Sequence, residues 1–492
     1  MTATIKIPKD LYIGAQWVAS SSVEDVLNPA TEESIGQVPV ADKATVDAAI
    51  GAARDAFDNG PWPNMAMVER KVYMQKFYEA LERRKEQIQA IITAEAGATV
   101  FLAQTHQYAT PMRHFQYYLS IMEQPTEQSL PVWYNAGPNN TTILGAGVVM
   151  REPIGVVSAI TAYNYPFLIN LSKVVPALCV GCTLVLKPSP LTPFQALILG
   201  EAAEEAGLPR GVFNVVNGGS DVGEMLTSDP RVDLVTFTGS DVVGGYIQAQ
   251  AAPTLKRVLL ELGGKSALIV RPDANLDGAV GWGLASFTMH AGQGCALTTR
   301  HLVHNSIRKA YVEKLGAAAA ALKVGNPADP ATQMGPVISA AQRKKTEDYV
   351  AIALDQGARL VTGGKRPGHL PKGYFHEPTL FDDVENHYRI AQEEVFGPIA
   401  VVIGYDTDEE AIAIANKSDF GLNGAIYSAD VGKAFQIARK LRTGGVHING
   451  SGGGMNSNAP FGGIKRSGYG REYGHEGLWE YTYQKSVQFR GG

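Results

Sequence analysis

The chain has 492 residues, of which 45% are hydrophobic and 18% charged, and its formal net charge is −5. This length suggests about three domains and allows a large core without disulfides or metals. The negative balance, without a basic cluster or a long apolar stretch, argues against nucleic-acid and membrane partners. The first residues lack the apolar core of a secretory signal, and three cysteines fit a reducing compartment, so we expect a cytoplasmic protein.

The first part of the chain is predicted to be largely helical. Alanine-rich periodic patterns with few breakers indicate helices at residues 44–57 and 69–96. The stretch 125–147 differs, because it places Trp133, Tyr134 and several threonines between proline and glycine. This composition is typical of a hairpin arm with an exposed aromatic pair, rather than of a core.

From Gly155 onward, short β-branched runs alternate with helical patterns. Strands are predicted at 156–160, 184–186, 212–216 and 234–237, with a helix at 193–206. This alternation favours a doubly wound, mostly parallel sheet. In such sheets, ligands bind beyond the carboxyl ends of the strands.

A second α/β region is predicted to begin near Gly263. The expected elements are helices at 307–322, 340–356 and 409–415, a strand at 400–403 and an edge strand at 481–489. The glycine-rich piece 450–454 is expected to form a loop at the mouth of a site.

Two segments at predicted strand ends could bind a dinucleotide, although the familiar G-x-G-x-x-G pattern is absent from these turns. In 237–244, Gly239 and Gly244 would let the backbone approach a pyrophosphate at a helix N-terminus. An ordinary turn with Ser240 as N-cap is slightly favoured by that segment alone. Lys187 could bind a ribose or a phosphate, although a lone lysine is more often simply solvated.

Three residues could carry carbonyl chemistry. Cys295 lies between Gly294 and Ala296, and Glu261 lies just before a Gly-Gly turn. A thiolate attacks carbonyl carbon, and a nearby carboxylate can activate water. Asn164 follows another predicted strand and could donate to an oxyanion. Taken singly, a buried inert cysteine and a turn-forming asparagine are the more common explanations.

Two further patterns have plainer interpretations. Cys179 and Cys182 form a C-x-x-C pair, but no second ligand pair accompanies them, so we predict inert thiols and no metal site. His290 precedes Cys295 by a few residues and could form the Cys–His dyad of a hydrolase. Most lone histidines are structural, so this alternative is the weaker one.

Taken together and in this order, the segments resemble the aldehyde dehydrogenase superfamily over nearly the whole chain, from 28–31 to 470–472. The strongest matches are 260–265, 292–295, 393–398 and 460–468. The resemblance implies NAD(P)-dependent oxidation of an aldehyde to a carboxylic acid. Because Glu261 is present, it also implies that water, rather than coenzyme A, accepts the acyl group.

The same resemblance implies roles for five catalytic residues. Cys295 would be the nucleophile and Glu261 the general base. Asn164 would donate to the oxyanion together with the backbone amide of Cys295. Lys173 and Glu472 would serve a proton relay behind the base.

The resemblance further implies a site for NAD or NADP. Lys187 would contact the adenosine ribose, residues 239–244 the pyrophosphate, and Glu394 and Phe396 the nicotinamide ribose and ring. Pro190 stands where many NAD-preferring relatives carry glutamate, so we expect NADP to be tolerated. The residues expected to line this site are Ile160, Thr161, Tyr163, Lys187, Ser189, Pro190, Gly218, Gly223, Phe237, Gly239, Ser240, Val243, Gly244, Leu262, Gly263, Glu394 and Phe396.

For the substrate, Tyr165, Met289, Met455 and Phe461 are expected to line a tunnel together with Tyr163. Their size, beside small residues at 450–454, favours bulky aromatic or long apolar aldehydes.

The expected architecture is α/β and has three parts. A Rossmann-like doubly wound cofactor domain would span 1–126 and 147–262, and a second α/β catalytic domain would span 263–473. A small β oligomerisation arm would combine 127–146 with 474–492, and the resemblance implies a homodimer or homotetramer. A cofactor-free cysteine hydrolase and a non-catalytic protein on the same scaffold are the alternatives from other classes.

Overall fold

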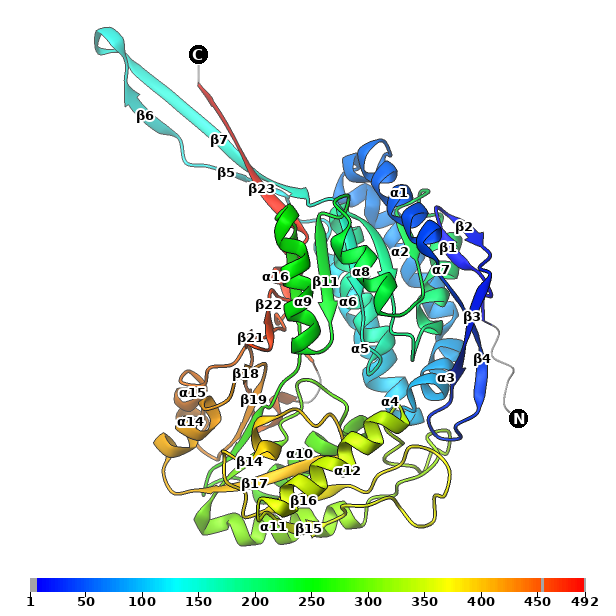
Figure 1. Cartoon of the computed structure of the whole chain (residues 1–492). Helices are drawn as coiled ribbons and strands as arrows, with labels where there is room; N and C mark the ends of the chain where they lie inside the picture. Colours follow the sequence, from blue (N-terminus) through cyan, green and yellow to red (C-terminus); the bar gives the residue numbers. More distant parts are fainter. Residues whose placement is uncertain (1–6, 453–454, 491–492) are drawn as a thin grey trace.

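The computed structural model describes residues 7–452 and 455–490 as two α/β bodies and a long projecting arm (Figure 1). The predicted mixed α/β fold with parallel sheets is confirmed. Two short hairpins, which the sequence analysis did not predict, lie near the amino end: β1 (Leu11–Ile13) with β2 (Gln16–Val18), and β3 (Ser22–Leu27) with β4 (Ser34–Val40).

The first body is built on a six-stranded sheet, and the predicted strands in it are confirmed. In spatial order the strands are β10 (Phe213–Val215), β9 (Thr183–Lys187), β8 (Val156–Ile160), β11 (Leu234–Thr238), β12 (Arg257–Glu261) and β22 (Gly468–Tyr469). All pairs are parallel except β12 with β22. The winding direction reverses between β8 and β11, which is the switch point where such sheets bind ligands.

Helices cover both faces of this sheet and bury β8 and β9 completely. Such double coverage explains why these strands are apolar throughout. On one face pack α1 (Lys43–Asp58), α8 (Ser220–Ser228) and α9 (Asp241–Ala251). On the other pack α2 (Met67–Arg83), α3 (Lys85–Ala96), α5 (Thr110–Ile121), α6 (Pro166–Val180) and α7 (Phe194–Ala206).

The single helix predicted at 69–96 is wrong, because the chain breaks between α2 and α3. Arg84 has φ −97° and ψ 9°, outside the helical region. It lies in the charged run 82–86, which offers no apolar side chain to keep a continuous helix on the core. Its guanidinium instead pairs with Glu205 on α7.

The second body contains a seven-stranded sheet in which only β15 is antiparallel. The spatial order is β15 (Arg359–Thr362), β16 (Thr379–Asp382), β17 (Ile399–Tyr405), β14 (Arg300–His304), β13 (Ala267–Val270), β19 (Gly424–Tyr427) and β20 (His447–Ile448). One face carries α10 (Leu276–Thr288) and α11 (Asn305–Ala320). The other carries α12 (Ala340–Asp355), α14 (Asp408–Asn416) and α15 (Val431–Ala438). The predicted helices and strand of this region are confirmed to within about two residues.

The arm is an antiparallel sheet that joins the predicted hairpin to the end of the chain. It consists of β5 (Glu127–Ser129), β6 (Trp133–Ala136), β7 (Thr142–Pro153) and β23 (Thr482–Arg490), and α16 (Gly474–Trp479) leads into β23. Tyr134 is 70% exposed, as expected. Trp133 is only half-exposed, which corrects the prediction, because its indole lies over Gly145, where any side chain would collide with it. The expected boundary between the arm and the cofactor domain, at residue 147, falls inside strand β7. The limits expected for the three domains therefore stay predictions.

Candidate active site

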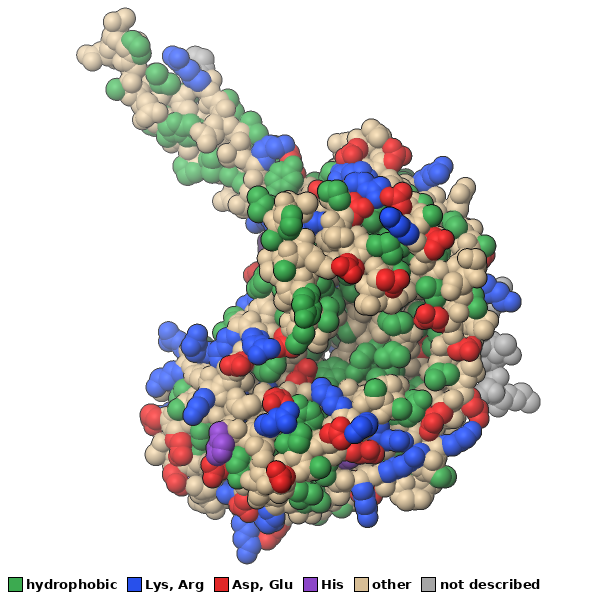
Figure 2. Space-filling model, in the orientation of Figure 1, with side chains coloured by type: hydrophobic (Ala, Val, Ile, Leu, Met, Phe, Trp, Pro, Cys, Tyr) green, Lys and Arg blue, Asp and Glu red, His purple; other side chains and the backbone are tan. Residues whose placement is uncertain are grey.

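The candidate residues gather where the two bodies meet. Asn164 follows β8, Lys187 is the last residue of β9 and Glu261 is the last residue of β12. All three therefore lie at the carboxyl edge of the first sheet. Cys295 and Glu394 lie in loops that lead into β14 and β17, at the amino edge of the second sheet. The site is therefore built from two sheet edges, and Figure 2 shows the surface hollowed between the two bodies.

The loop before Cys295 has an uncommon backbone. His290 has φ 50° and Gly292 has φ 74°, both in the left-handed region. A side chain at position 292 would come within 2.0 Å of the Gly397 carbonyl oxygen, so only glycine fits there. Gln293 Nε2 donates to the His290 carbonyl at 3.0 Å and braces the turn. These constraints fix the position of the thiol.

Asn164 is buried and anchored next to this loop. Its Nδ2 donates to the Gln293 carbonyl at 3.0 Å, two residues from Cys295. The backbone carbonyl of Asn164 accepts a hydrogen bond from Gln107 Nε2 at 2.8 Å. Gln107 lies in η2 (Ala103–Ala109), a π-helical segment that the sequence analysis did not single out. The side-chain amide of Asn164 is thus held against the loop that carries Cys295.

Glu261 and Cys295 influence each other electrostatically. Glu261 is buried, and both of its carboxyl oxygens lack hydrogen-bond partners among the described residues. Burial raises the pKa of Glu261 well above its usual value, and the charge of Glu472 raises it further, whereas Lys173 opposes the shift. Burial also raises the pKa of the Cys295 thiol, and Glu261 is the largest charged contributor. The uncharged forms of both groups are therefore favoured in the unliganded site.

A buried ion pair lies behind Glu261. Lys173 Nζ on α6 contacts Glu472 Oε1 at 2.7 Å and Thr236 Oγ1 on β11 at 3.1 Å. Glu472 is positioned by two backbone hydrogen bonds of 2.7 Å with Phe461. The expected relay residues are thus brought together across most of the chain.

Glu394 and Phe396 lie in the loop before β17 and contact the turn after Glu261 and the segment after β8. Glu394 Oε1 accepts a hydrogen bond from the backbone N–H of Gly264 at 2.9 Å. This approach needs glycine at 263, where a Cβ would lie 2.5 Å from Glu394 Oε2. Burial raises the pKa of Glu394 to about 6. Phe396 meets Tyr163 edge-on, with ring centroids 5.9 Å apart.

The far end of the expected cofactor site is centred on Lys187. Burial lowers the pKa of Lys187 to about 8, and the charges of Asp221 and Glu24 oppose that shift. Position 223 faces the lysine, since a Cβ there would lie 3.8 Å from Lys187 Cε. Pro190 is exposed. The sequence analysis missed Asp221 and Glu24, because neither lies near Lys187 in the chain.

The other residues expected at a cofactor site lie along the same edge of the first sheet. Ser240 caps α9 by accepting a hydrogen bond from the Val243 N–H at 3.3 Å, and Val243 itself is exposed. α9 packs closely on Leu262 at Gly244. The other expected residues lie in β8, β11 or the turns that follow the strands of this sheet: Ile160, Thr161, Ser189, Gly218, Phe237 and Gly239. An open helix N-terminus beside glycine turns fits a pyrophosphate.

On the substrate side, the rings of Tyr165 and His290 meet edge-on with centroids 5.4 Å apart. Burial raises the pKa of Tyr165, and the Cys295 thiol raises it further. Met289 packs in the same apolar cluster as Tyr165, and Met455 and Phe461 are half-buried. The expected small-residue mouth falls partly on Gly453 and Gly454, which lie outside the described residues.

Two expectations about histidine and cysteine can be compared with these contacts. Neither nitrogen of His290 has a hydrogen-bond partner among the described residues, so the alternative Cys–His dyad is not formed. Cys179 and Cys182 are buried free thiols. Within 7–452 and 455–490, no group of three or more His, Cys, Asp or Glu side chains could hold a metal ion. Over the same residues, no helix is long and apolar enough to cross a bilayer.

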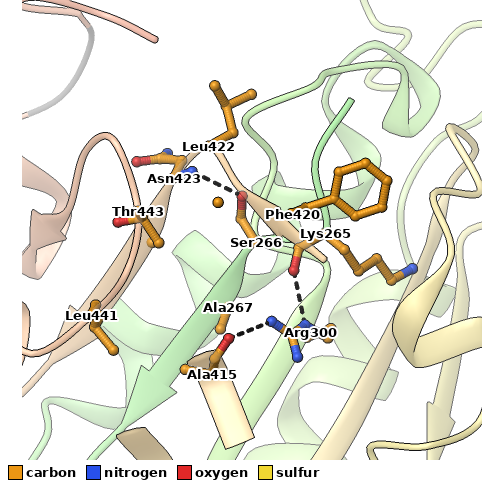
Figure 3. Close-up of a pocket in the computed structure, with 12 residues that line it drawn as sticks. Lys265, Ser266, Ala267, Arg300, Ala415, Phe420, Leu422, Asn423, Leu441 and Thr443 are labelled. Carbon is orange, nitrogen blue, oxygen red and sulfur yellow. Dashed lines mark hydrogen bonds between the residues drawn. The ribbon is translucent and has the colours of Figure 1, made fainter. Parts of the chain in front are cut away.

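A small pocket next to the site shows how the second sheet supports the 260–265 segment (Figure 3). Arg300 Nε donates to the Lys265 carbonyl at 2.8 Å, and Nη2 donates to the Ala415 carbonyl at 2.9 Å. Ser266 Oγ accepts from the Asn423 N–H at 3.3 Å. These bonds join the starts of β13 and β14, so they hold the segment after Glu261 in register with the loop that carries Cys295.

Taken together, a doubly wound sheet and a thiol, a carboxylate and an amide at its ligand-binding edge define an α/β enzyme with a cysteine nucleophile candidate. The sequence profile described as "Aldehyde dehydrogenase family" matches residues 17–487. The chain belongs to the aldehyde dehydrogenase family, a family of NAD(P)-dependent oxidoreductases, and the resemblance seen in the sequence is confirmed.

Individual relatives match over almost their whole length. The chain is 39% identical over 483 residues to geranial dehydrogenase of Castellaniella defragrans, covering 98% of each protein. It is 40% identical over 486 residues to 3-succinoylsemialdehyde-pyridine dehydrogenase of a Pseudomonas species, covering 97% of this chain and 98% of the relative. Among solved structures, Mycobacterium tuberculosis aldehyde dehydrogenase complexed with NAD+ superposes with a TM-score of 0.91 at 43% identity, covering 97% of each chain.

Proposed function

We propose that this enzyme oxidises an aldehyde to a carboxylic acid, with NAD or NADP as hydride acceptor and water as acyl acceptor. The observation that carries the proposal is the convergence of the Cys295 thiol, the Glu261 carboxyl and the Asn164 amide between two sheet edges. The NAD+ complex of the Mycobacterium tuberculosis relative supports the choice of cofactor class.

The chemistry follows from these side chains. The thiol of Cys295 gives its proton to the ionised carboxylate of Glu261, and its sulfur adds to the carbonyl carbon of the aldehyde. The resulting oxyanion accepts hydrogen bonds from Asn164 Nδ2 and from the backbone N–H of Cys295, each worth about 3 kcal/mol in the transition state. The bound nicotinamide supplies the acceptor for the hydride that leaves this carbon. A thioester on Cys295 remains.

Hydrolysis of the thioester is assigned to Glu261. Its ionised carboxylate removes a proton from water, the water oxygen attacks the thioester carbon, and the thiolate leaves. The proton can pass from Glu261 to the Lys173–Glu472 pair behind it, which lies close enough to shift its pKa. The same pair keeps this part of the site rigid.

A dinucleotide would fit beside Gly263, the Glu394 carboxylate and the N-terminus of α9. Lys187, Glu394 and Phe396 would hold its two ends. Pro190 provides no carboxylate to repel a 2′-phosphate, although Asp221 and Glu24 approach Lys187. We therefore propose that NAD is used and that NADP is tolerated.

For the substrate we propose an aromatic or long apolar aldehyde. Tyr165 and Met289 pack in one apolar cluster, and we assign them with Phe461 to the substrate side of Cys295. The names of the two relatives, for geranial and for a pyridine semialdehyde, support this choice. The arm exposes Tyr134, at 70%, and Phe489, at 56%, which fits a homodimer or homotetramer. Three free cysteines fit a cytoplasmic location.

The decisive experiment is an aldehyde panel in which reduced cofactor is followed by absorbance, with NAD and NADP in parallel. In Glu261→Gln, a burst of one reduced cofactor per site should persist while steady turnover is lost, because the thioester forms but is not hydrolysed. Glu313→Gln, an exposed carboxylate on α11, is the matched control and should behave like the unmodified enzyme. An unchanged steady-state rate in Glu261→Gln would show that Glu261 is not the general base for thioester hydrolysis.

A further inference from the structure

A threonine hydroxyl lies on a buried face of the first sheet, where the neighbouring side chains are apolar. Thr236 is in the middle of β11 and is 1% exposed. Its register partners are Ala159 on β8 and Leu259 on β12, and both belong to the core that α6 covers. A buried hydroxyl in such a place lowers stability unless it has a hydrogen bond, so its partner explains why it is there.

The Lys173 ammonium is the hydrogen-bond partner of this hydroxyl. Lys173 is fully buried in α6, and its Nζ donates to Thr236 Oγ1 at 3.1 Å and to Glu472 Oε1 at 2.7 Å. Among the described residues, this ammonium has no other hydrogen bond. A buried charge is stable only when it is paired and hydrogen-bonded. The two acceptors come from β11 and from the segment after β22, so together they fix the direction of a long side chain.

Glu261 projects from the same face of the sheet. In the parallel pairing of β11 with β12, Thr236 lies opposite Leu259, and Thr238 lies opposite Glu261. Side chains two positions apart on a strand point to the same face, so Leu259 and Glu261 both lie on the side of Thr236 and α6. The hydroxyl therefore holds the ammonium on the side of the sheet where the proposed base lies.

Glu261 responds to how the charges around it are placed. Burial raises its pKa, the neighbouring carboxylates raise it further, and the neighbouring cations oppose the shift. The carboxylates are Glu472 and Glu480, the cations are Lys173 and Arg471, and the Cys295 thiol faces the same carboxyl. An ammonium that is held less firmly opposes the shift less, so loss of the hydroxyl should raise the pKa of Glu261.

Building on the function proposed above, we propose that Thr236 is a positioning residue for the transfer of protons away from Glu261. Its hydroxyl oxygen holds the Lys173 ammonium beside Glu472, and Lys173 in turn holds the Glu472 carboxylate. In the transfer, an O–H bond of Glu261 breaks and an O–H bond of Glu472 forms, while the ammonium keeps its own protons. Thioester hydrolysis needs an ionised Glu261 in every turnover, so it is the step that depends on the hydroxyl.

The test is Thr236→Val, which keeps the shape of the side chain and removes the hydroxyl. Steady turnover should fall about 3- to 10-fold after a burst of one reduced cofactor per site, while the KM for NAD stays within about twofold. The acid limb of the pH profile of turnover should move to higher pH by about 0.5 unit or more, because Glu261 holds its proton more tightly. Thr236→Ser retains the hydroxyl and should restore both the turnover and the acid limb.

Thr183→Val is the matched control, because it removes another buried hydroxyl of the same sheet. Thr183 Oγ1 donates to the Ala53 carbonyl at 2.8 Å, at the amino end of β9 and away from the site. This variant should lower Tm much as Thr236→Val does, since each loses one buried hydrogen bond. Its turnover and its acid limb should stay those of the unmodified enzyme.

A folded Thr236→Val whose acid limb does not move, or an equal movement in Thr183→Val, would overturn this inference alone. If circular dichroism shows that Thr236→Val does not fold, Thr236→Ala decides by the same two readouts. If the unmodified enzyme oxidises no aldehyde, or if Glu261→Gln turns over normally, the proposed function itself fails, so the two failures are distinguishable.

Discussion

Removal of Lys173 is expected to lower the stability of the folded protein. Its ammonium is fully buried and contacts Glu472 at 2.7 Å, and Glu472 is itself only 7% exposed. Lys173→Met keeps the side-chain volume but leaves a buried carboxylate without its counter-ion, which costs about 3–5 kcal/mol. With an unfolding entropy of roughly 1 kcal/mol per kelvin for 492 residues, Tm should fall by about 3–5 °C.

The assay is thermal unfolding followed by circular dichroism, completed as a double-mutant cycle. In Lys173→Met/Glu472→Leu the uncompensated charge is gone, so most of the lost stability should return while turnover stays low. Lys344→Met, which breaks the exposed pair with Asp348, is the control and should leave Tm unchanged. A Tm for Lys173→Met within about 1 °C of the unmodified enzyme would refute this reasoning.

Three further predictions concern activity. Asn164→Ala should lower kcat by about 10²- to 10³-fold with little change in the KM for NAD, because it removes an oxyanion donor, and a loss below tenfold would speak against that role. Because burial and Glu472 raise the pKa of Glu261, and the base must be ionised, turnover should rise with pH until this group has lost its proton. A pH profile that is flat, or that falls over this range, would contradict that assignment. Pro190→Glu should reduce the NADP/NAD ratio of kcat/KM by at least about tenfold through charge repulsion, and no measurable NADP turnover in the unmodified enzyme would refute the premise.

Much of the fold could be predicted because its signals are local. The run of five apolar residues that forms β8 has the predicted bounds 156–160, since both faces of the strand are covered and periodicity alone suffices. The break at Arg84 was missed although the charged run 82–86 is a local signal for it, whereas the pairing of Arg84 with Glu205, far away in the chain, leaves no local signal. Trp133 was misjudged for a similar reason, since the groove that shields it depends on Gly145 across the hairpin.

The residues of the candidate site also differ in whether a local sequence signal could reveal them. Cys295, Glu261 and Asn164 lie in short segments whose order resembles a known family, so they were found. The contact of Lys173 with Glu472 spans 299 positions and was expected only through that resemblance.

One continuous stretch of chain runs from the strand beside Glu261 into the arm, where β23 pairs with β7 as far as Gly145. β22 is paired with the end of β12 at Glu261, Glu472 follows within a few residues, and α16 then leads directly into β23 (Figure 1). Mechanical load or a bulky fusion applied at the carboxyl terminus is therefore transmitted along a short tether to the buried carboxylates. Tags placed at that end would alter turnover without touching any side chain of the pocket.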